Sequence, residues 1–235
     1  MERVNNKIIN SVRARYLIIP AVILVLLLAS VPARAASIVI NEFLADPATG
    51  ILGDANGDGL SSSTQDEFVE LVNSSDTDLD ISGWLISDSI STTHVFPTGT
   101  VLSPGAAIVV FGGGTPTGEF GGAIVQTASS SNLSLNNTGD TITVSDGVTN
   151  QAVATFGRAG NYDQSLTLNP DVYGGTYEGH LYAAGSGGRR FSPGTMVDGT
   201  PFVAPVPVPG SLLLLSSGVA VIWRTRRTAL QQACR

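Results

Sequence analysis

Seven short segments rich in β-branched and aromatic residues, each bounded by turn residues, set the class of fold open to this chain. Helical periodicity is nearly absent, and turn sequences such as Asp46-Pro47 and Asp146-Gly147 separate the segments. Short strands at this spacing are typical of an antiparallel β-sandwich, which we therefore predict. The segments are Ser37–Ala45 (SIVINEFLA), Glu67–Asn73 (EFVELVN), Ile81–Ser87 (ISGWLIS), Ala106–Phe111 (AAIVVF), Ile124–Gln126, Thr141–Ser145 (TITVS) and Ala152–Phe156 (AVATF).

Two stretches near the end of this series have more specific interpretations. Thr143–Phe156 (TVSDGVTNQAVATF) predicts a β-hairpin that turns at Asp146-Gly147. Beyond Arg158 the strand pattern gives way to glycine-rich sequence with four tyrosines and Phe191. We expect this stretch to be a long arm that packs over the sandwich through its aromatic side chains. The alternative is that the tyrosines and Gly187–Phe191 (GGRRF) form a contact surface.

The strand pattern also predicts a core and raises a question about two glutamates. Trp84 follows Gly83 and is expected to fill the space between the sheets. By simple alternation Glu42 shares a face with its apolar neighbours, so it lies at a solvated strand end or accepts backbone hydrogen bonds inside. For Glu42 and Glu70 a structural role is favoured over a catalytic one. The other core candidates are Phe43, Val69, Leu71, Leu85, Val109 and Phe111.

The N-terminus has the order of a secretory signal. Residues 1–15 carry four basic side chains against Glu2, the apolar run Tyr16–Ala29 follows, and Ala33-Arg34-Ala35 supplies small residues for a signal peptidase. We expect a signal peptide over 1–35, with cleavage near Ala35–Ala36. An uncleaved membrane anchor is the alternative, although the run is short for a span of roughly 20 residues.

The C-terminus combines a proline-rich stretch, an apolar run and a basic end. Residues 201–209 predict a linker, and Val206–Arg227 (VPVPGSLLLLSSGVAVIWRTRR) predicts a transmembrane segment with its arginines on the cytoplasmic side. This tail resembles the PEP-CTERM sorting signal, which exosortases process in Gram-negative bacteria. The motif aligns on Pro207-Val208-Pro209, where Val208 stands in place of the family's glutamate. The resemblance implies export across the inner membrane, a temporary tether, and a final place on the cell surface or in the extracellular matrix.

The region between these ends is one strongly acidic domain, predicted over residues 36–200. About 174 residues lie between the two terminal signals, and three arginines and no lysine oppose eighteen acids, a formal charge of −15. Such a surface repels phosphate backbones, so no nucleic-acid partner is expected, whereas divalent cations are attracted. The single cysteine, Cys234, lies beyond the tail's arginines, so the domain has no disulfide.

Several motifs follow one another along the predicted domain. They are Ile38–Pro47 (IVINEFLADP), Asp66–Asn73 (DEFVELVN), Asp78–Ser89 (DLDISGWLISDS), His94–Gly112 (HVFPTGTVLSPGAAIVVFG), Asn137–Gly147 (NTGDTITVSDG) and the closing stretch Asp163–Thr195. In this order they resemble the lamin tail domain, an immunoglobulin-like β-sandwich found on nuclear lamins and on many secreted bacterial proteins. The resemblance covers about residues 37–195 and implies an immunoglobulin-like sandwich.

An acidic loop between the first two strands has the spacing of a calcium ligand set. Alternate oxygen-bearing residues that end on glycine aim their side chains inward, and Ca²⁺ prefers oxygen ligands. Gln65 occupies the twelfth position, so this is not an EF-hand but an EF-like loop closed by Asp66 or Glu67. The alternative is a turn rich in Asp and Asn with solvated acids. The candidate calcium ligands are Asp54, Asn56, Asp58, Leu60, Asp66 and Glu67.

The sequence has few features of an enzyme. No nucleophile elbow, paired-histidine zinc motif or Cys/His zinc set is present. His94 and His180 are interpreted as surface or hydrogen-bonding residues, and Phe111–Gly118 (FGGGTPTG) as a loop. We therefore expect no enzyme and no catalytic residues, but a structural or binding protein of the cell envelope or matrix, with a polysaccharide or surface protein as partner. The alternative is a polysaccharide hydrolase or an accessory module of a secreted hydrolase.

Overall fold

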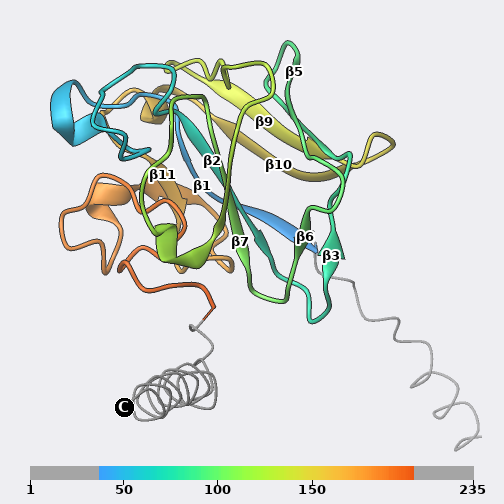
Figure 1. Ribbon diagram of the computed structural model, residues 1–235. Helices are drawn as coiled ribbons and strands as arrows, with labels where there is room; N and C mark the ends of the chain where they lie inside the picture. The colour runs from blue at the N-terminus through green and yellow to red at the C-terminus, as the bar shows by residue number, and fades with distance from the viewer. Residues whose placement is uncertain (1–36, 204–235) are drawn as a thin grey trace, which may run out of the picture. The chain divides into compact units, whose positions relative to one another are not determined.

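The computed structural model describes residues 37–203, which form β-strands, short 3₁₀ turns and loops (Figure 1). The predicted signal peptide and sorting segment lie outside these residues. Within the described part of the chain, no helix is long and apolar enough to cross a membrane. The elements are β1 (Ile38–Leu44), η1 (Gly50–Gly53), β2 (Phe68–Asn73), β3 (Leu79–Asp80), β4 (Leu85–Ser87), β5 (Thr92–Val95), β6 (Val101–Leu102), β7 (Ala107–Phe111), η2 (Phe120–Gly122), β8 (Ile124–Thr127), β9 (Asp140–Ser145), β10 (Asn150–Phe156), η3 (Arg158–Gly160), β11 (Leu166–Leu168), β12 (Tyr177–Gly179) and η4 (His180–Tyr182).

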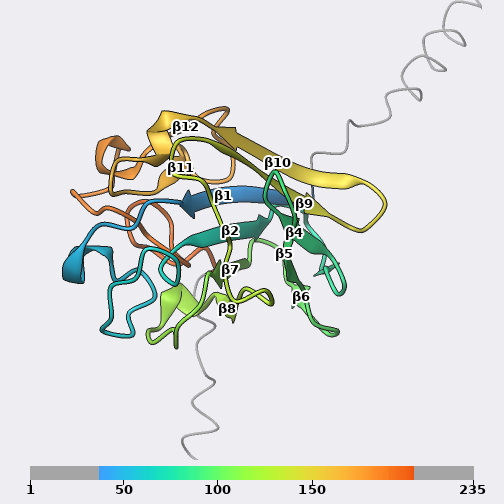
Figure 2. The same cartoon turned by 90° about the horizontal axis from the view of Figure 1, so that it is seen from above.

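One layer is a six-stranded sheet in the order β12-β11-β1-β2-β7-β8, which Figure 2 shows from above. Its neighbours pair antiparallel except β7 and β8, which are parallel, with Ile108 opposite Ile124. The prediction of a purely antiparallel sandwich was therefore wrong for this pair. The connection over residues 112–123, which holds the glycine-rich loop, is long enough to bring the chain back beside the N-terminal end of β7. β8 can therefore run parallel to β7.

The second layer is a four-stranded antiparallel sheet in the order β10-β9-β4-β5, and β3 and β6 form a separate two-stranded ribbon. The predicted hairpin is confirmed as β9 and β10, with Asp146 Oδ1 accepting the backbone N–H groups of Val148 and Thr149 in its turn. The structure is thus an all-β sandwich with one mixed and one antiparallel sheet.

The main core lies between the two sheets. Phe43 is central to it, with ring centroids 4.9 Å from Phe156 and 5.0 Å from Tyr177. Leu85, predicted for this core, is only half-buried, and Trp84 packs against the core from the turn before β4 rather than from a strand. Buried members from the six-stranded sheet are Ile38, Ile40, Phe43, Val69, Leu71, Ile108, Val110 and Leu166, and those from the four-stranded sheet are Ile86, Ile142, Val144, Ala154 and Phe156.

The outer face of the six-stranded sheet is covered as well. A second apolar cluster of Leu44, Phe68, Val109 and Phe111 lies there, and Phe120 and Phe191 pack against it. Every residue of β2 and β7 is therefore buried. This explains their nearly continuous apolar sequences, which a sheet with one solvated face would not need.

A register shift in β1 decides which way Glu42 points. Between Ile40 and Glu42 the pairing of β1 with β2 slips by one residue, as in a β-bulge. Ile40 and Phe43 consequently face the main core, whereas Glu42 and Leu44 face outward. The expectation that Glu42 shares a face with Ile38 and Ile40 was wrong, because simple alternation assumes an unbroken ladder.

Candidate binding groove and buried carboxylate cluster

The acidic loop and the glycine-rich loop, distant in sequence, bind each other. Asp58 Oδ2 accepts the N–H of Thr115 at 3.1 Å, and the side-chain nitrogen of Asn56 donates to the carbonyl of Gly113 at 3.3 Å. Gly114 has φ +75° and no room for a Cβ, which would lie 2.4 Å from Asn56 Nδ2. Glycine is therefore required where the two loops meet.

The carboxylates of the acidic loop bind backbone N–H groups. Asp66 accepts from Asn56 at 3.0 Å and from Ser62 at 2.7 Å, and Asp54 Oδ2 accepts from Gly59 at 2.9 Å. Backbone hydrogen bonds, first that from Thr115, lower the pKa of Asp58, whereas burial raises that of Asp66. Leu60 is exposed, and its N–H donates to Asp58. These bonds stiffen the strand connection.

Of the two residues proposed to close the loop, Asp66 faces into it and Glu67 does not. Glu67 is buried, and its carboxyl accepts the N–H of Leu135 at 3.4 Å. Asp54 Oδ1 is buried and has no hydrogen-bond partner. Over residues 37–203, no group of three or more His, Cys, Asp or Glu side chains is arranged to hold a metal ion. Both interpretations of the loop, calcium site and polar turn, therefore remain hypotheses.

Glu42 and Glu70 are paired across β1 and β2 on the covered face of the sheet, and both are fully buried. Glu42 accepts the N–H of Ser192 at 2.9 Å, and Glu70 accepts the N–H of Gly194 at 2.6 Å. Asn41 donates to Glu70 at 2.9 Å. Of the two placements that the sequence left open for Glu42, the one inside the protein with backbone hydrogen bonds is confirmed.

Both histidines of the described domain are buried and hydrogen-bonded. His94 Nε2 is 2.9 Å from Gln126 Oε1, and burial lowers the pKa of His94. His180 lies against Ser192, with 2.9 Å between Nε2 and Oγ. A serine beside a histidine resembles a catalytic pair, but His180 and Ser192 are both buried where the arm meets the sheet.

The arm is held by strands, by buried polar contacts and by two of its aromatic side chains, Tyr177 and Phe191. It adds β11 and β12 to the six-stranded sheet. Tyr177 packs against the core and donates to the carbonyl of Ile40, but Tyr162, Tyr173 and Tyr182 are 61%, 84% and 79% exposed. Packing through the tyrosines was therefore the wrong prediction for three of the four.

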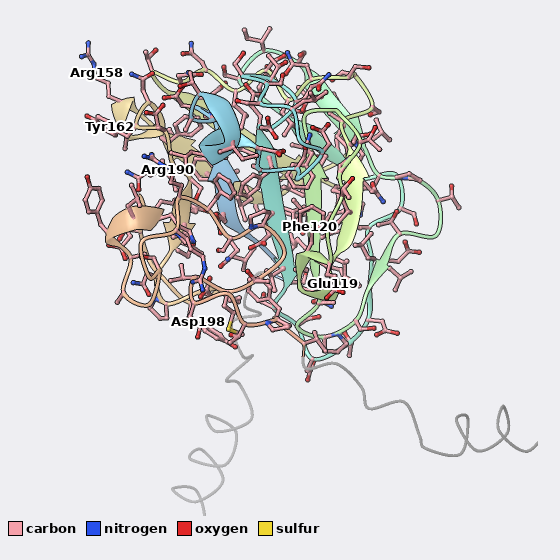
Figure 3. All side chains as sticks on the ribbon, turned by 60° about the vertical axis from the view of Figure 1, so that its left-hand side comes forward. Glu119, Phe120, Arg158, Tyr162, Arg190 and Asp198 are labelled. Atoms are coloured by element: carbon pink, nitrogen blue, oxygen red, sulfur yellow. The ribbon has the colours of Figure 1, made fainter. Side chains whose placement is uncertain are left out.

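Two of the domain's three arginines lie near one of these tyrosines. Arg190 donates to the carbonyl of Asp163 at 2.8 Å, next to Tyr162, and Figure 3 shows Arg158, Tyr162 and Arg190 on one side of the domain. Glu119 and Phe120 lie at a distance from them in the same view. Arg158 and Arg190 thus lie away from Glu119, which borders the groove described next.

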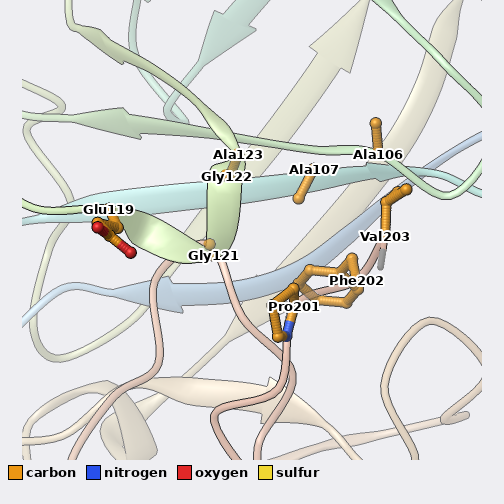
Figure 4. A pocket seen from close by; sticks show the side chains of 10 residues that line it. Ala106, Ala107, Glu119, Gly121, Gly122, Ala123, Pro201, Phe202 and Val203 are labelled. Carbon is orange, nitrogen blue, oxygen red and sulfur yellow. The ribbon is translucent and has the colours of Figure 1, made fainter. Parts of the chain in front are cut away.

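A groove, here called the arm groove, runs where the end of the arm crosses β7 and its connections. Its first cavity, of about 560 Å³, has Ala107 and Gly122 on one side and Pro201 and Phe202 on the other, with Glu119 at its border (Figure 4). Pro201 is paired with Thr195 in an isolated bridge. This cavity has no recognisable motif in the sequence, because its lining is mostly glycine, alanine and proline.

A second cavity, of about 340 Å³, shares Phe202 with the first and extends the arm groove. Its lining includes the exposed Tyr173 together with Asp171 and Met196 from the arm. Asp171 is fixed in place because its carboxylate accepts the N–H of Val197 and the side chain of Asn41. The arm groove therefore combines two aromatic rings, small apolar residues and two carboxylates.

The fold defines this chain as an immunoglobulin-like β-sandwich with a covering arm. The Lamin Tail Domain family matches residues 32–160, more than half of the chain, so the chain belongs to the lamin tail domain family. No curated protein matches the sequence. The family match ends just before the arm, so β11, β12 and one wall of the arm groove come from outside it.

Proposed function

We propose that this chain is an exported, non-catalytic binding protein of the cell envelope or extracellular matrix, and that its ligand is a polysaccharide held in the arm groove. The observation that supports this most is the groove itself, formed where the arm folds back over β7. Family membership is consistent with a structural or binding role. Function on such folds resides in surfaces added to the sandwich, and the arm is the added surface here.

The chemistry of the arm groove suits a saccharide. Tyr173 and Phe202 offer flat apolar rings to the C–H faces of a sugar, and the carboxylates of Asp171 and Glu119 can accept hydrogen bonds from its hydroxyls. The charge of −15 on residues 36–209 repels polyanions. We therefore favour a neutral or amino polysaccharide over an acidic one.

The hydrolase alternative requires acids that a substrate can reach. Glu42 and Glu70 are a pair of carboxyls side by side, but both are fully buried beneath the arm. A glycosidase places its two carboxyls on either side of an accessible sugar bond. This pair supports a role in holding the arm rather than in hydrolysis.

The proposed export and surface sorting of the protein rest on its terminal sequences. The signal-like order of residues 1–35 supports cleavage by signal peptidase. The proline-apolar-basic order of Val206–Arg227 supports a temporary membrane tether and processing by an exosortase-type enzyme, with Val208 in place of the motif glutamate. The mature domain would then act on the surface or in the matrix of a Gram-negative bacterium.

Binding measurements on the full chain test the proposed function. Tyr173→Ala and Phe202→Ala are each expected to weaken binding of a neutral or amino polysaccharide about fivefold or more, because losing an aromatic anchor costs over about 1 kcal/mol. Affinity electrophoresis in gels that contain neutral, cationic or anionic polysaccharides provides the measurement. Tyr182→Ala is the matched control, since Tyr182 is 79% exposed and lines neither cavity.

Equal losses in Tyr173→Ala and Tyr182→Ala would contradict the groove assignment. Binding restricted to anionic polymers would contradict the charge argument and direct attention to Arg158 and Arg190. Shortening of the polymer during binding would favour the hydrolase. Absence of binding to every polysaccharide would favour a protein partner instead.

Calcium binding at the acidic loop is a separate proposal, supported by the unpaired Asp54 Oδ1 and its neighbour Asp66. Calcium is expected to raise the melting temperature of the full chain, because a ligand at a hundredfold excess over its Kd adds about 2.7 kcal/mol to the free energy of unfolding. Asp54→Asn should remove this effect while keeping one acceptor oxygen, and Asp76→Asn, at an exposed acid elsewhere, should not. An unchanged melting temperature at millimolar calcium would identify the loop as a polar turn.

A further inference from the structure

The arm is joined to the sheet by a buried chain of three side chains. Ser192 Oγ lies 2.6 Å from Glu42 Oε2 and 2.9 Å from His180 Nε2. The other ring nitrogen, Nδ1, lies 2.9 Å from the carbonyl oxygen of Arg189. Glu42 comes from β1, whereas the serine and the histidine come from the arm. This chain therefore spans the contact between arm and sheet.

The hydrogen bonds among Glu42, Ser192 and His180 require one more proton than an ionised glutamate and a neutral histidine provide. A carbonyl only accepts, so Nδ1 of His180 carries a hydrogen in every state. If Glu42 is ionised and Nε2 is bare, the single hydroxyl hydrogen of Ser192 faces two acceptors. One of these two short contacts is then acceptor against acceptor, which is costly in a dry site.

A single added proton satisfies every contact in two equivalent ways. Glu42 can carry it and donate to Ser192, which then donates to Nε2. Alternatively, His180 can carry it and donate to Ser192, which then donates to the carboxylate. In both states Glu42 Oε1 accepts from Ser165 Oγ at 2.6 Å and from the N–H of Ser192 at 2.9 Å.

We propose that one proton, shared between Glu42 and His180 through Ser192, fastens the C-terminal arm to the sheet, and that its loss at alkaline pH releases the arm. The proton passes to solvent when the arm opens. Because Asp171, Tyr173 and Phe202 belong to the released segment, opening would also dismantle the arm groove. The inference concerns the attachment of the arm and holds whether or not the groove binds a polysaccharide.

The charged groups around the chain favour retention of the proton. Glu70 faces Glu42 from β2, and Asp171 approaches Glu70 through Asn41. The guanidinium groups of Arg189 and Arg190 donate to backbone carbonyls outside the chain, at Ser186 and Val197 and at Asp163. The nearby groups other than His180 are therefore mainly acidic, and a second negative charge at Glu42 would be unfavourable.

The direction of the pKa shifts agrees with this placement. Burial raises the pKa of Glu42, and burial followed by the charge of Glu42 raises that of Glu70. A carboxyl with a raised folded-state pKa gives stability that is complete below its unfolded value, and this stability is lost as the pH rises through the folded value. The arm should accordingly be held at neutral pH and loosened at alkaline pH.

Trypsin can measure the opening of the arm, because the Arg190–Phe191 bond lies within the attached segment and the Arg190 carbonyl accepts the N–H of Ser165 at 2.9 Å. Cleavage at this bond reports the open population when opening is fast relative to cleavage. The parent protein for this experiment is the full-length protein with Glu67→Gln, which removes another buried acid whose titration would add its own pH dependence. Cleavage of this parent protein after Arg190 is expected to rise up to tenfold per pH unit at alkaline pH. Rates are normalised to a flexible peptide substrate at each pH.

Variants separate a shared proton from a merely structural contact. Glu42→Gln reproduces the hydrogen pattern of the protonated acid, so the alkaline rise should be lost. Ser192→Ala removes the hydroxyl that links Glu42 to His180 and should increase cleavage after Arg190 tenfold or more at pH 7. His94→Gln, which alters the buried histidine outside the arm, should leave the pH dependence unchanged. The proposal is overturned if the cleavage rate of Glu42→Gln rises with pH as steeply as that of the parent protein. It is also overturned if the cleavage rate of the parent protein does not rise.

A second readout applies if Glu42→Gln does not fold. Carbon and nitrogen NMR signals of the Glu42 carboxyl and the His180 ring in the parent chain report where the proton lies at pH 7. The proposal expects a protonated carboxyl with a neutral ring, or a carboxylate with an imidazolium. A carboxylate beside a neutral ring at pH 7 overturns it.

Discussion

Truncation of Phe43 to alanine is expected to lower the free energy of unfolding by about 3–5 kcal/mol, which would leave much of the protein unfolded near physiological temperature. Phe43 is fully buried at the centre of the main core, between Phe156 and Tyr177. The backbone of β1 is held on both sides by β2 and β11, so the space cannot close by collapse. No disulfide supports the domain when its core is weakened.

Urea denaturation followed by circular dichroism measures this change. Ile90→Ala serves as the control, because Ile90 is 90% exposed and its loss should change stability by less than about 0.5 kcal/mol. A loss below about 1 kcal/mol for Phe43→Ala would mean that the two sheets do not pack around this ring.

Replacement of Glu67 by glutamine is expected to stabilise the protein at alkaline pH by roughly 3–5 kcal/mol and to change little at pH 4. Burial, supported by the charge of Asp140, raises the pKa of Glu67 to about 8 in the folded protein. Because the folded value lies above the unfolded one, the acid's contribution is complete below about pH 4.5. It is lost as the pH rises toward 8.

Denaturant titrations from pH 4 to pH 9, in chelator so that no metal contributes, give the required stability profile. The parent chain should lose stability across this range more steeply than Glu67→Gln. Glu119→Gln, at an exposed glutamate, should follow the parent. Parallel profiles for the parent and Glu67→Gln would show that Glu67 reaches water and titrates as an exposed acid.

Strands with clear residue alternation, an apolar run or a turn sequence at their end could be predicted from local sequence. The hairpin of β9 and β10 follows from alternating residues around Asp146-Gly147, and the apolar sequences of β1, β2 and β7 identify the buried sheet. The class of fold followed from these elements and from motifs that resemble the family. Each signal lies within a few residues, so no knowledge of distant contacts was needed.

Features that depend on distant contacts could not be predicted in the same way. The strands β11 and β12 have three residues each and exist because they pair with β1 and with each other. The outward turn of Glu42 depends on the bulge in β1, and the burial of Glu42 depends on the arm. The arm groove is lined both by residues of the sandwich and by residues of the arm, which are distant in sequence. Its existence therefore depends on how the arm folds back and could not be predicted from local sequence.

The candidate site shows the same division. The spacing from Asp54 to Asp58 predicted a calcium loop or a polar turn, but not that the glycine-rich loop supplies an N–H group to it. Tyrosines in the arm suggested either packing or contact, and only the fold separates Tyr177, which packs, from Tyr173, which borders the groove.

Chemical-shift mapping by NMR is the most direct test of the claim that the arm provides the binding surface. An isotope-labelled full chain would be titrated with a neutral or amino oligosaccharide that represents the polymer bound in gels. The account predicts shifts at Tyr173, Phe202 and the Gly121–Gly122 turn, which surround the arm groove. Shifts confined to the exposed turns around Ile90 and Val148, outside both cavities, would contradict it.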